Sequence, residues 1–335
     1  SVRQFNDTVR EVYGTTPTQL RGRRGRRAAT PGTIRLRLAV RTPFHGSGLL
    51  RFLRLRALPG VEATGDGWYA RTLRLPHGPG TIRLELPDLP QAGAATVGVD
   101  LTLGDLRDIA AAVERTGRLL DADCDPVAIT AALGPDPLLG PLLERWPGLR
   151  LPGHVDGAEV AVRAIVGQQI SVAGARTVLG RLVRQYGEPL PASPPPTPEL
   201  THLFPTPQAL ATLSPDDLPM PRARGRALVG LCRALADGDL ALDRGPDRHR
   251  TRAALLALPG IGDWTASYLA IRALGDPDAF MPTDLGTRQA LTRLGCDPGR
   301  AATLAEDWRP WRSYAQSLLW QVLLDPEGFP HVARD

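Results

Sequence analysis

The period of the apolar residues changes along this chain, and that change limits the folds open to it. Between residues 33 and 103 apolar and polar side chains alternate, most clearly over residues 34–40. A period of two is typical of half-buried β-strands. From about residue 124 the alternation disappears and apolar residues recur at helical spacing. We therefore predict an α+β fold, with a small antiparallel sheet domain at 33–123 and a larger all-helical domain at 124–335.

The same spacing predicts the individual helices. In the sheet domain we expect helices at Gly48–Leu58 and Asp105–Leu120, and no catalytic cluster, so this domain is interpreted as a scaffold. In the second domain the predicted helices are Val160–Ile170, Val172–Tyr186, Pro207–Leu213, Arg222–Asp237, Arg252–Leu258, Asp263–Leu274, Leu285–Leu294, Arg300–Trp308 and Trp311–Leu324.

The chain contains no lysine, so all 40 of its Lys+Arg residues are arginine. This excludes mechanisms that need a lysine amine, such as Schiff-base chemistry and P-loop nucleotide hydrolysis. The three cysteines, Cys124, Cys232 and Cys296, are far apart and match no disulfide, zinc or iron–sulfur spacing. The chain has no run of 18 apolar residues, so we predict no membrane span. We also expect no cofactor.

The first 23 residues predict two short helices, and residues 24–32 a basic linker. Phe5, Gly14, Pro17 and Leu20 resemble the end of an AraC-type helix-turn-helix domain, and residues 1–8 resemble the recognition segment of the Ada family of alkylation-response regulators. This resemblance implies the C-terminal part of an Ada-like regulator fused to a second unit. A solvated helical arm is the alternative, and whether this segment binds DNA stays open.

The most informative segment is the string 258–266, in which Pro259-Gly260-Ile261-Gly262 separates two predicted helices. Glycines permit a tight hairpin with close backbone approach, and the following helix directs free N–H groups toward it, which suits a phosphate. The string L-P-G-I-G-x-W-T-A resembles the helix-hairpin-helix of the base-excision DNA glycosylases. The resemblance implies DNA contacts by Gly260, Ile261, Gly262 and Thr265. It leaves open a monovalent ion at the hairpin carbonyls near Leu258, and we predict no other metal.

A carboxylate follows the hairpin at a fixed distance. Asp284 lies 22 residues after Gly262, directly before a predicted helix. From its position alone it would serve as a helix cap. In the superfamily that the hairpin resembles, an aspartate about 20 residues beyond the hairpin is the catalytic carboxylate. We therefore predict that Asp284 is catalytic, and the two roles are compatible.

Two further segments indicate which branch of the DNA glycosylases the chain resembles. The segment 164–171 contains Gly-Gln-Gln-Ile-Ser, and the segment 308–315 is followed by Trp320. Both resemble the 3-methyladenine DNA glycosylase II branch, and the likeness extends from about residue 33 to 325. It implies that Gln168 faces the base pocket and that Gln169 approaches the gap left in the duplex by an extruded nucleotide.

Aromatic side chains complete the predicted site. Trp264 and Tyr268 are four residues apart and share one helix face. With Trp320 they would stack on a cationic base, and the alternative is that they only pack the core. Position 264 is where the superfamily's glycosylase/lyases carry their Schiff-base lysine, so the resemblance implies a monofunctional enzyme here.

These observations predict a monofunctional DNA glycosylase for alkylated purines of the 3-methyladenine and 7-methylguanine type. The base would leave the stack, and Asp284 would stabilise the oxocarbenium-like sugar. The alternatives are an alkylation-response transcription regulator and a non-enzymatic helix-hairpin-helix DNA-binding module. We expect a cytoplasmic, nucleoid-associated monomer with double-stranded DNA as its partner and no membrane contact.

Overall fold

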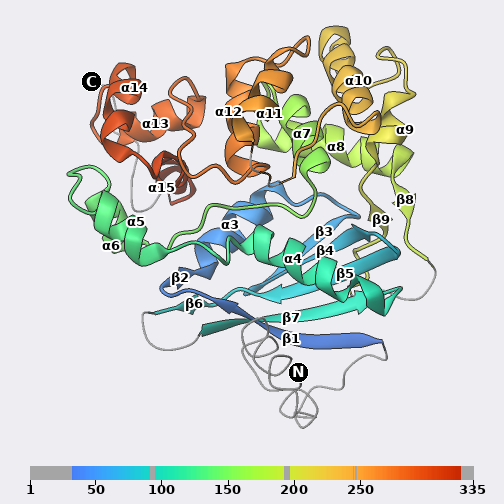
Figure 1. Ribbon diagram of the computed structural model, residues 1–335, viewed down its shortest axis with the longest axis horizontal. Helices are drawn as coiled ribbons and strands as arrows, with labels where there is room; N and C mark the ends of the chain where they lie inside the picture. The colour runs from blue at the N-terminus through green and yellow to red at the C-terminus, as the bar shows by residue number, and fades with distance from the viewer. Residues whose placement is uncertain (1–31, 91–94, 192–196, 244, 246, 326–335) are drawn as a thin grey trace.

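The computed structural model describes residues 32–90, 95–191, 197–243, 245 and 247–325. The predictions for residues 1–23 and for the linker up to residue 31 lie outside these ranges. The elements carry the labels of Figure 1.

A five-stranded antiparallel sheet forms the base of the molecule, with strand order β1-β7-β5-β4-β3. The strands are β1 (Thr33–Val40), β3 (Glu62–Gly65), β4 (Trp68–Leu75), β5 (Gly78–Glu85) and β7 (Ala95–Leu103). Leu36 pairs with Val99 and Ile82 with Leu101, so the buried members of each alternation lie on one face. Two short strands, β2 (Phe44–His45) and β6 (Asp88–Leu89), pair beside the sheet.

Two helices cover the buried face of the sheet, α3 (Gly46–Arg56) and α4 (Ile109–Leu120), the latter preceded by a 3₁₀ turn at Leu106–Asp108. Phe52 of α3 and Leu119 of α4 belong to the same apolar core as Leu73 of the sheet. Figure 1 shows both helices between the sheet and the remaining helices. Because α3 is packed on both sides, it can present residues to the helical part as well as to the sheet.

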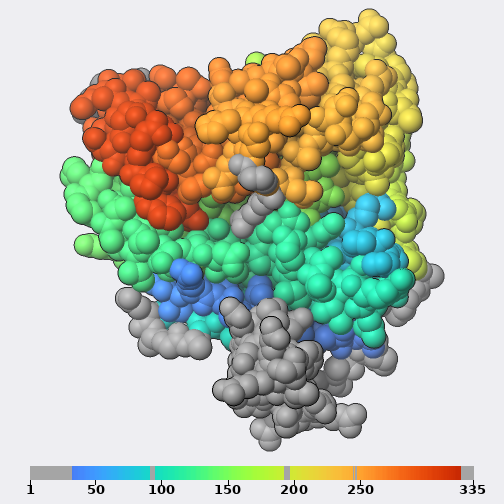
Figure 2. Space-filling model, viewed as in Figure 1, coloured from blue at the N-terminus to red at the C-terminus, as the bar shows by residue number. Residues whose placement is uncertain are grey.

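The rest of the described chain is almost entirely helical. Its α-helices are α5 (Pro126–Leu133), α6 (Gly140–Arg145), α7 (Gly157–Val166), α8 (Val172–Tyr186), α9 (Pro207–Ala211), α10 (Arg222–Ala236), α11 (Arg248–Leu256), α12 (Asp263–Arg272), α13 (Leu285–Arg293), α14 (Ala301–Leu304) and α15 (Arg312–Leu324). Two 3₁₀ turns, Pro298–Arg300 and Ala305–Trp308, flank α14, and the two-residue strands β8 (Glu188–Pro189) and β9 (His202–Leu203) pair with each other. Figure 2 shows the yellow-to-red helical part standing over the blue-to-teal sheet part.

The predicted α+β fold is confirmed, and the differences are local. Helix α8 has the predicted bounds, whereas α7 ends at Val166, so the prediction that it reaches Ile170 is wrong. The backbone cannot continue as a helix there because Gln169 has φ 56°. The short helices α5 and α6 were not predicted, because Pro126 and Gly140 stand at their starts and weaken the periodic pattern. In the ranges that the structure describes, no helix is long and apolar enough to cross a membrane.

Candidate active site and glycine hairpin

The glycine hairpin joins α11 to α12 as predicted. Gly260 has φ +85°, a conformation that favours glycine, and a Cβ there would lie 2.6 Å from the Cβ of Ala227. Gly262 has φ −98° and open space around its Cα, and no side chain caps the first turn of α12. The hairpin therefore leaves the N–H groups at the start of α12 without a side-chain acceptor, which is the arrangement that suits a phosphate.

Two residues predicted to bind DNA are buried inside the hairpin. Ile261 is 5% exposed and packs in the helical core, and Thr265 is 2% exposed. Their side chains are therefore turned inward, so DNA contacts at these positions would come from backbone atoms, and the predicted contacts of Ile261 and Thr265 stay a prediction. Leu258 O accepts a hydrogen bond from Ile261 N, and the monovalent ion near Leu258 stays a prediction.

Asp284 is both the cap of α13 and the centre of a polar cluster. Its Oδ2 accepts hydrogen bonds from the backbone N–H of Thr287 at 2.9 Å and from the Thr287 hydroxyl at 3.2 Å. The indole N–H of Trp264 donates to Oδ1 at 2.9 Å, and that of Trp320 donates to Oδ2 at 3.1 Å. Asp284 therefore caps α13, as its sequence position indicates. The same hydrogen bonds hold the carboxylate in one orientation at the edge of a cavity.

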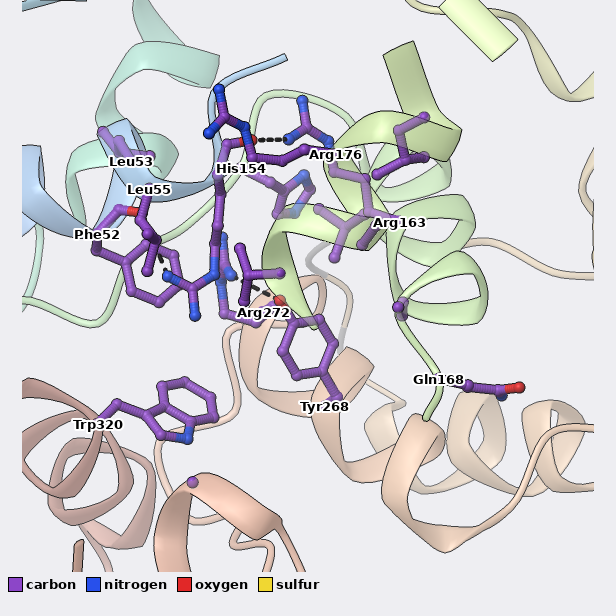
Figure 3. A pocket seen from close by; sticks show the side chains of 18 of the residues that line it. Phe52, Leu53, Leu55, His154, Arg163, Gln168, Arg176, Tyr268, Arg272 and Trp320 are labelled. Carbon is purple, nitrogen blue, oxygen red and sulfur yellow. Dashed lines mark hydrogen bonds between the residues drawn. The ribbon is translucent and has the colours of Figure 1, made fainter. Parts of the chain in front are cut away.

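Aromatic rings form the walls next to this carboxylate. Trp264 and Tyr268 stack with ring centroids 5.4 Å apart and planes 11° from parallel. The centroid of Trp320 lies 6.2 Å from that of Tyr268 and 6.3 Å from that of Phe52. The structure therefore brings the three predicted aromatic residues together and adds Phe52, from the domain that was interpreted as a scaffold. Figure 3 shows Phe52, Tyr268 and Trp320 around one hollow.

Two arginines lie behind these rings, and neither was predicted. Arg272 donates to the Tyr268 hydroxyl at 2.9 Å and to the carbonyl of Gly153 at 3.1 Å, and its Cζ lies 4.7 Å from the Phe52 ring centroid. The Cζ of Arg56 lies 3.8 Å from the same centroid. Burial lowers the pKa of the Arg56 guanidinium to about 10, so it remains charged at neutral pH. The sequence carried a signal, because Phe52 and Arg56 are four residues apart in a predicted helix.

The two glutamines occupy the loop between α7 and α8. Gln168 donates from Nε2 to Gly260 O at 3.2 Å and to the Thr265 hydroxyl at 3.0 Å, so its amide is turned to the hairpin. Figure 3 shows Gln168 pointing away from the aromatic hollow. Gln168 also belongs to the cavity lining, and its predicted place facing the base stays a prediction. Gln169 is exposed at the cavity mouth, and its predicted approach to the duplex gap stays a prediction.

A buried ionic cluster joins the sheet to α7 and forms part of the cavity lining. Arg163 contacts Glu62 at 2.6 Å and Glu159 at 2.5 Å, and Arg71 contacts Glu159 at 2.6 Å. The Tyr69 hydroxyl donates to Glu62 at 2.5 Å. Burial opposes ionisation of Glu159, but the two guanidiniums outweigh it and lower the pKa of that carboxyl. Within this cluster two positive charges meet two negative ones, so it adds no net charge to the cavity.

The cavity itself has a volume of about 1190 Å³ and lies between α3, α7, α8, α12, α13 and α15. That exceeds the range of about 300–1,000 Å³ common for small-molecule sites. Among the described residues no group of three His, Cys, Asp or Glu side chains is placed to bind a metal ion. A glycine hairpin, a fixed carboxylate and an aromatic pocket on one face define a helix-hairpin-helix protein with a pocket for a flat ring.

Comparison with known proteins agrees with this class. Residues 35–156 match the family model described as the AlkA N-terminal domain, and residues 162–312 match that of the HhH-GPD superfamily base excision DNA repair protein. The chain is 38% identical over 282 residues to the DNA-3-methyladenine glycosylase 2 of Escherichia coli, which covers 83% of this chain and 94% of that protein. It therefore belongs to the HhH-GPD superfamily of base excision DNA repair proteins, in the branch with an AlkA N-terminal domain.

The chain is also 47% identical over 333 residues to a probable bifunctional transcriptional activator/DNA repair enzyme AlkA of Mycobacterium tuberculosis. That match covers 97% of this chain but 65% of the mycobacterial protein, so the chain spans about two thirds of the length of that relative. Among solved structures, a 3-methyladenine DNA glycosylase from Archaeoglobus fulgidus superimposes with TM-score 0.71 at 22% identity, covering 88% of this chain and 99% of its own. An 8-oxoguanine glycosylase/lyase from Clostridium acetobutylicum gives TM-score 0.66 at 15% identity, with 89% and 97% coverage. These two likenesses concern the fold.

Proposed function

We propose that this protein is a DNA glycosylase that hydrolyses the N-glycosidic bond of alkylated purines, 3-methyladenine and 7-methylguanine among them, in double-stranded DNA. The observation that carries the proposal is the Asp284 carboxylate, held by the indole N–H groups of Trp264 and Trp320 at the edge of an aromatic pocket. The name of the E. coli relative supports the substrate class.

The proposed reaction uses these groups in the following way. The damaged nucleotide leaves the stack so that its base enters the pocket and its sugar lies beside Asp284. Electrons of the C1′–N bond pass to the base, and the sugar becomes an oxocarbenium-like cation that the carboxylate stabilises. Water then adds to C1′ and loses a proton. An alkylated purine is already a cation and leaves as a neutral base, so a strong general acid is not required.

The aromatic rings serve base selection in this proposal. Trp264, Tyr268 and Trp320 present π-faces and edges to the pocket. A ring face attracts a cation with about 0.5–2 kcal/mol, so an alkylated base is favoured over an undamaged one. The rings also exclude water from the carboxylate, which strengthens its interaction with the developing charge on the sugar.

The proposed enzyme carries out hydrolysis and not strand cleavage. A β-lyase step requires an amine that forms an imine with the sugar aldehyde. The chain has no lysine, and position 264 carries an indole that is engaged with Asp284. The abasic strand would therefore be released intact.

The hairpin is the proposed anchor on the duplex. The backbone N–H groups at Gly260–Gly262 and the start of α12 would contact phosphates, with arginines adding affinity that falls as salt rises. Anchor and pocket lie on one chain, so a monomer would suffice. The test is release of 3-methyladenine from methylated duplex by the wild type and by Asp284→Asn. Duplex binding with no base release by the wild type would favour a non-enzymatic DNA-binding module.

A further inference from the structure

The pocket has charge at two ends. Nearest to Asp284 are the rings of Trp264 and Trp320, whose indole N–H groups donate to the carboxylate. The next rings are Tyr268, which stacks on Trp264, and Phe52, which contacts Trp320. Beyond Phe52 lie the guanidiniums of Arg56 and Arg272, each within 5 Å of its ring centroid. A base held among these rings therefore has the carboxylate on one side and two guanidiniums on the other.

Among the described residues, the guanidiniums of Arg56 and Arg272 form no ion pair, unlike the neighbouring guanidiniums. Arg71 and Arg163 each form ion pairs with buried glutamates. In the part of the chain that the structure describes, Arg56 donates only to the carbonyl of Phe52, at 3.3 Å, and forms no ion pair. Arg272 donates to a hydroxyl and two carbonyls, none of them charged. Two further charged residues of the lining, Arg176 and Asp156, have opposite signs, so the charges of Arg56 and Arg272 leave the pocket lining opposite Asp284 with an excess of positive charge.

This charge is unexpected for a pocket that receives cationic bases, because it repels them in the ground state. The reaction, however, transfers an electron pair from the C1′–N bond to the base. The charge on the base changes by −1 in every case: a cationic base leaves neutral, and a neutral base leaves as an anion. A fixed cation beside the base favours that change, and a fixed anion beside the sugar favours the opposite change there.

We propose that the Arg56 guanidinium, supported by Arg272, is the base-side electrostatic partner of Asp284, and that it accelerates bond cleavage for cationic and neutral bases alike while weakening ground-state binding of cationic ones. The inference rests on the proposed glycosylase function. It assigns a catalytic task to α3 of the sheet domain. Arg56 is the member of the pair to test, because Arg272 also holds Tyr268 and the backbone at 152–153.

The test uses the whole chain with enzyme in excess over duplexes that carry one 7-methylguanine, which is cationic, or one hypoxanthine, which is neutral. Arg56→Met should lower the single-turnover rate constant by about 30-fold on both, the scale of one charge acting across a protein pocket. Its half-saturating concentration for the 7-methylguanine duplex should be no higher than that of the wild type. Arg56→Lys keeps the charge and should stay within about threefold of the wild type.

Arg54→Met is the matched control, since Arg54 lies on the same helix, is exposed and bonds the carbonyl of Gly65. Arg56→Gln supplies the neutral variant if the methionine protein does not fold. Unchanged rates in a folded neutral variant would overturn the inference, as would an Arg56→Lys defect equal to that of Arg56→Met. A loss confined to the neutral base would also overturn it, because that pattern indicates a hydrogen bond and not a field. If the wild type releases neither base, the proposed function itself fails.

Discussion

The indole nitrogen of Trp264 lies 2.9 Å from Oδ1 of Asp284, so this side chain is a hydrogen-bond donor to the proposed catalytic carboxylate. Trp320 contributes the second indole donor, to Oδ2. Both indoles therefore shape the pocket and also fix the direction in which the carboxylate points.

Trp264→Phe keeps an aromatic face and removes one of these donors. A hydrogen bond to a charged group contributes about 1.5–3 kcal/mol, so we expect base release to slow by about tenfold or more while duplex affinity stays unchanged. Trp320→Phe removes the other donor and should act in the same direction. Single-turnover base release and duplex titration measure the two quantities, and a rate equal to that of the wild type in both variants would show that the indoles only pack the pocket.

Asp284→Asn tests the carboxylate itself. Asparagine can still cap α13, but it carries no charge, so release of 3-methyladenine should fall by at least about a hundredfold with duplex binding retained. Asp247→Asn is the matched control, since Asp247 caps α11 through Arg250 N and lies outside the pocket lining. Near-normal release by Asp284→Asn would remove this residue from the mechanism.

The hairpin is best tested at Gly262. Gly260→Val would be strained by its positive φ and by Ala227 even without DNA, whereas a Cβ at Gly262 meets nothing within 4 Å. Gly262→Val should therefore fold, obstruct the approach of a phosphate and weaken binding to all duplexes alike. Gly117→Val, in α4 with equally open surroundings, is the control. Duplex affinity at two salt concentrations gives the answer, and an unchanged affinity and salt slope would mean that the duplex is anchored elsewhere.

Lyase activity should be absent. After base loss the abasic strand should remain intact, and borohydride should trap no covalent adduct, because the chain has no lysine. Denaturing gels of strand cleavage and of trapped complexes measure this, with a bifunctional glycosylase/lyase on its own substrate as the positive control. Efficient trapping with this chain would contradict a monofunctional enzyme.

The buried cluster predicts a pH effect on stability. Because Arg71 and Arg163 lower the pKa of Glu159 in the folded state, its contribution is fully present above the unfolded pKa of about 4.3 and is lost as pH falls through the folded pKa. Glu159→Gln should lower the free energy of unfolding by about 3–5 kcal/mol at pH 7, since it leaves two buried guanidiniums, Arg71 and Arg163, with the single carboxylate of Glu62. The loss should shrink in acid.

Denaturant unfolding at pH 7 and at pH 3.5 measures this difference. Glu188→Gln removes one side of the exposed pair with Arg74 and should change stability by less than about 1 kcal/mol. Equal effects of the two substitutions on the free energy of unfolding would show that the buried ion pairs contribute no more to stability than the exposed one.

The sequence predicted the parts of the site that lie close together along the chain. The hairpin, Asp284 and the Trp264–Tyr268 face follow from local spacing, and the structure brings them together. Arg56 was missed because a basic residue on an amphipathic helix is usually solvated, and only the packing of α3 against α15 and α8 turns it inward. The hydrogen bond from Gln168 to Gly260 could not be predicted, because the hairpin is 92 residues away in the sequence.

Because α3 directs Phe52 and Arg56 toward the pocket, the proposed DNA contact and part of the proposed base contact are assigned to different domains of the chain. The surface proposed to grip the duplex belongs to the helical domain, whereas Phe52 and Arg56, part of the wall against the base, come from the sheet domain. Under the proposed function, substitutions on α3 would therefore change lesion preference and leave the proposed DNA contacts of the hairpin intact. For an engineer seeking altered lesion preference, this helix is the place to diversify first.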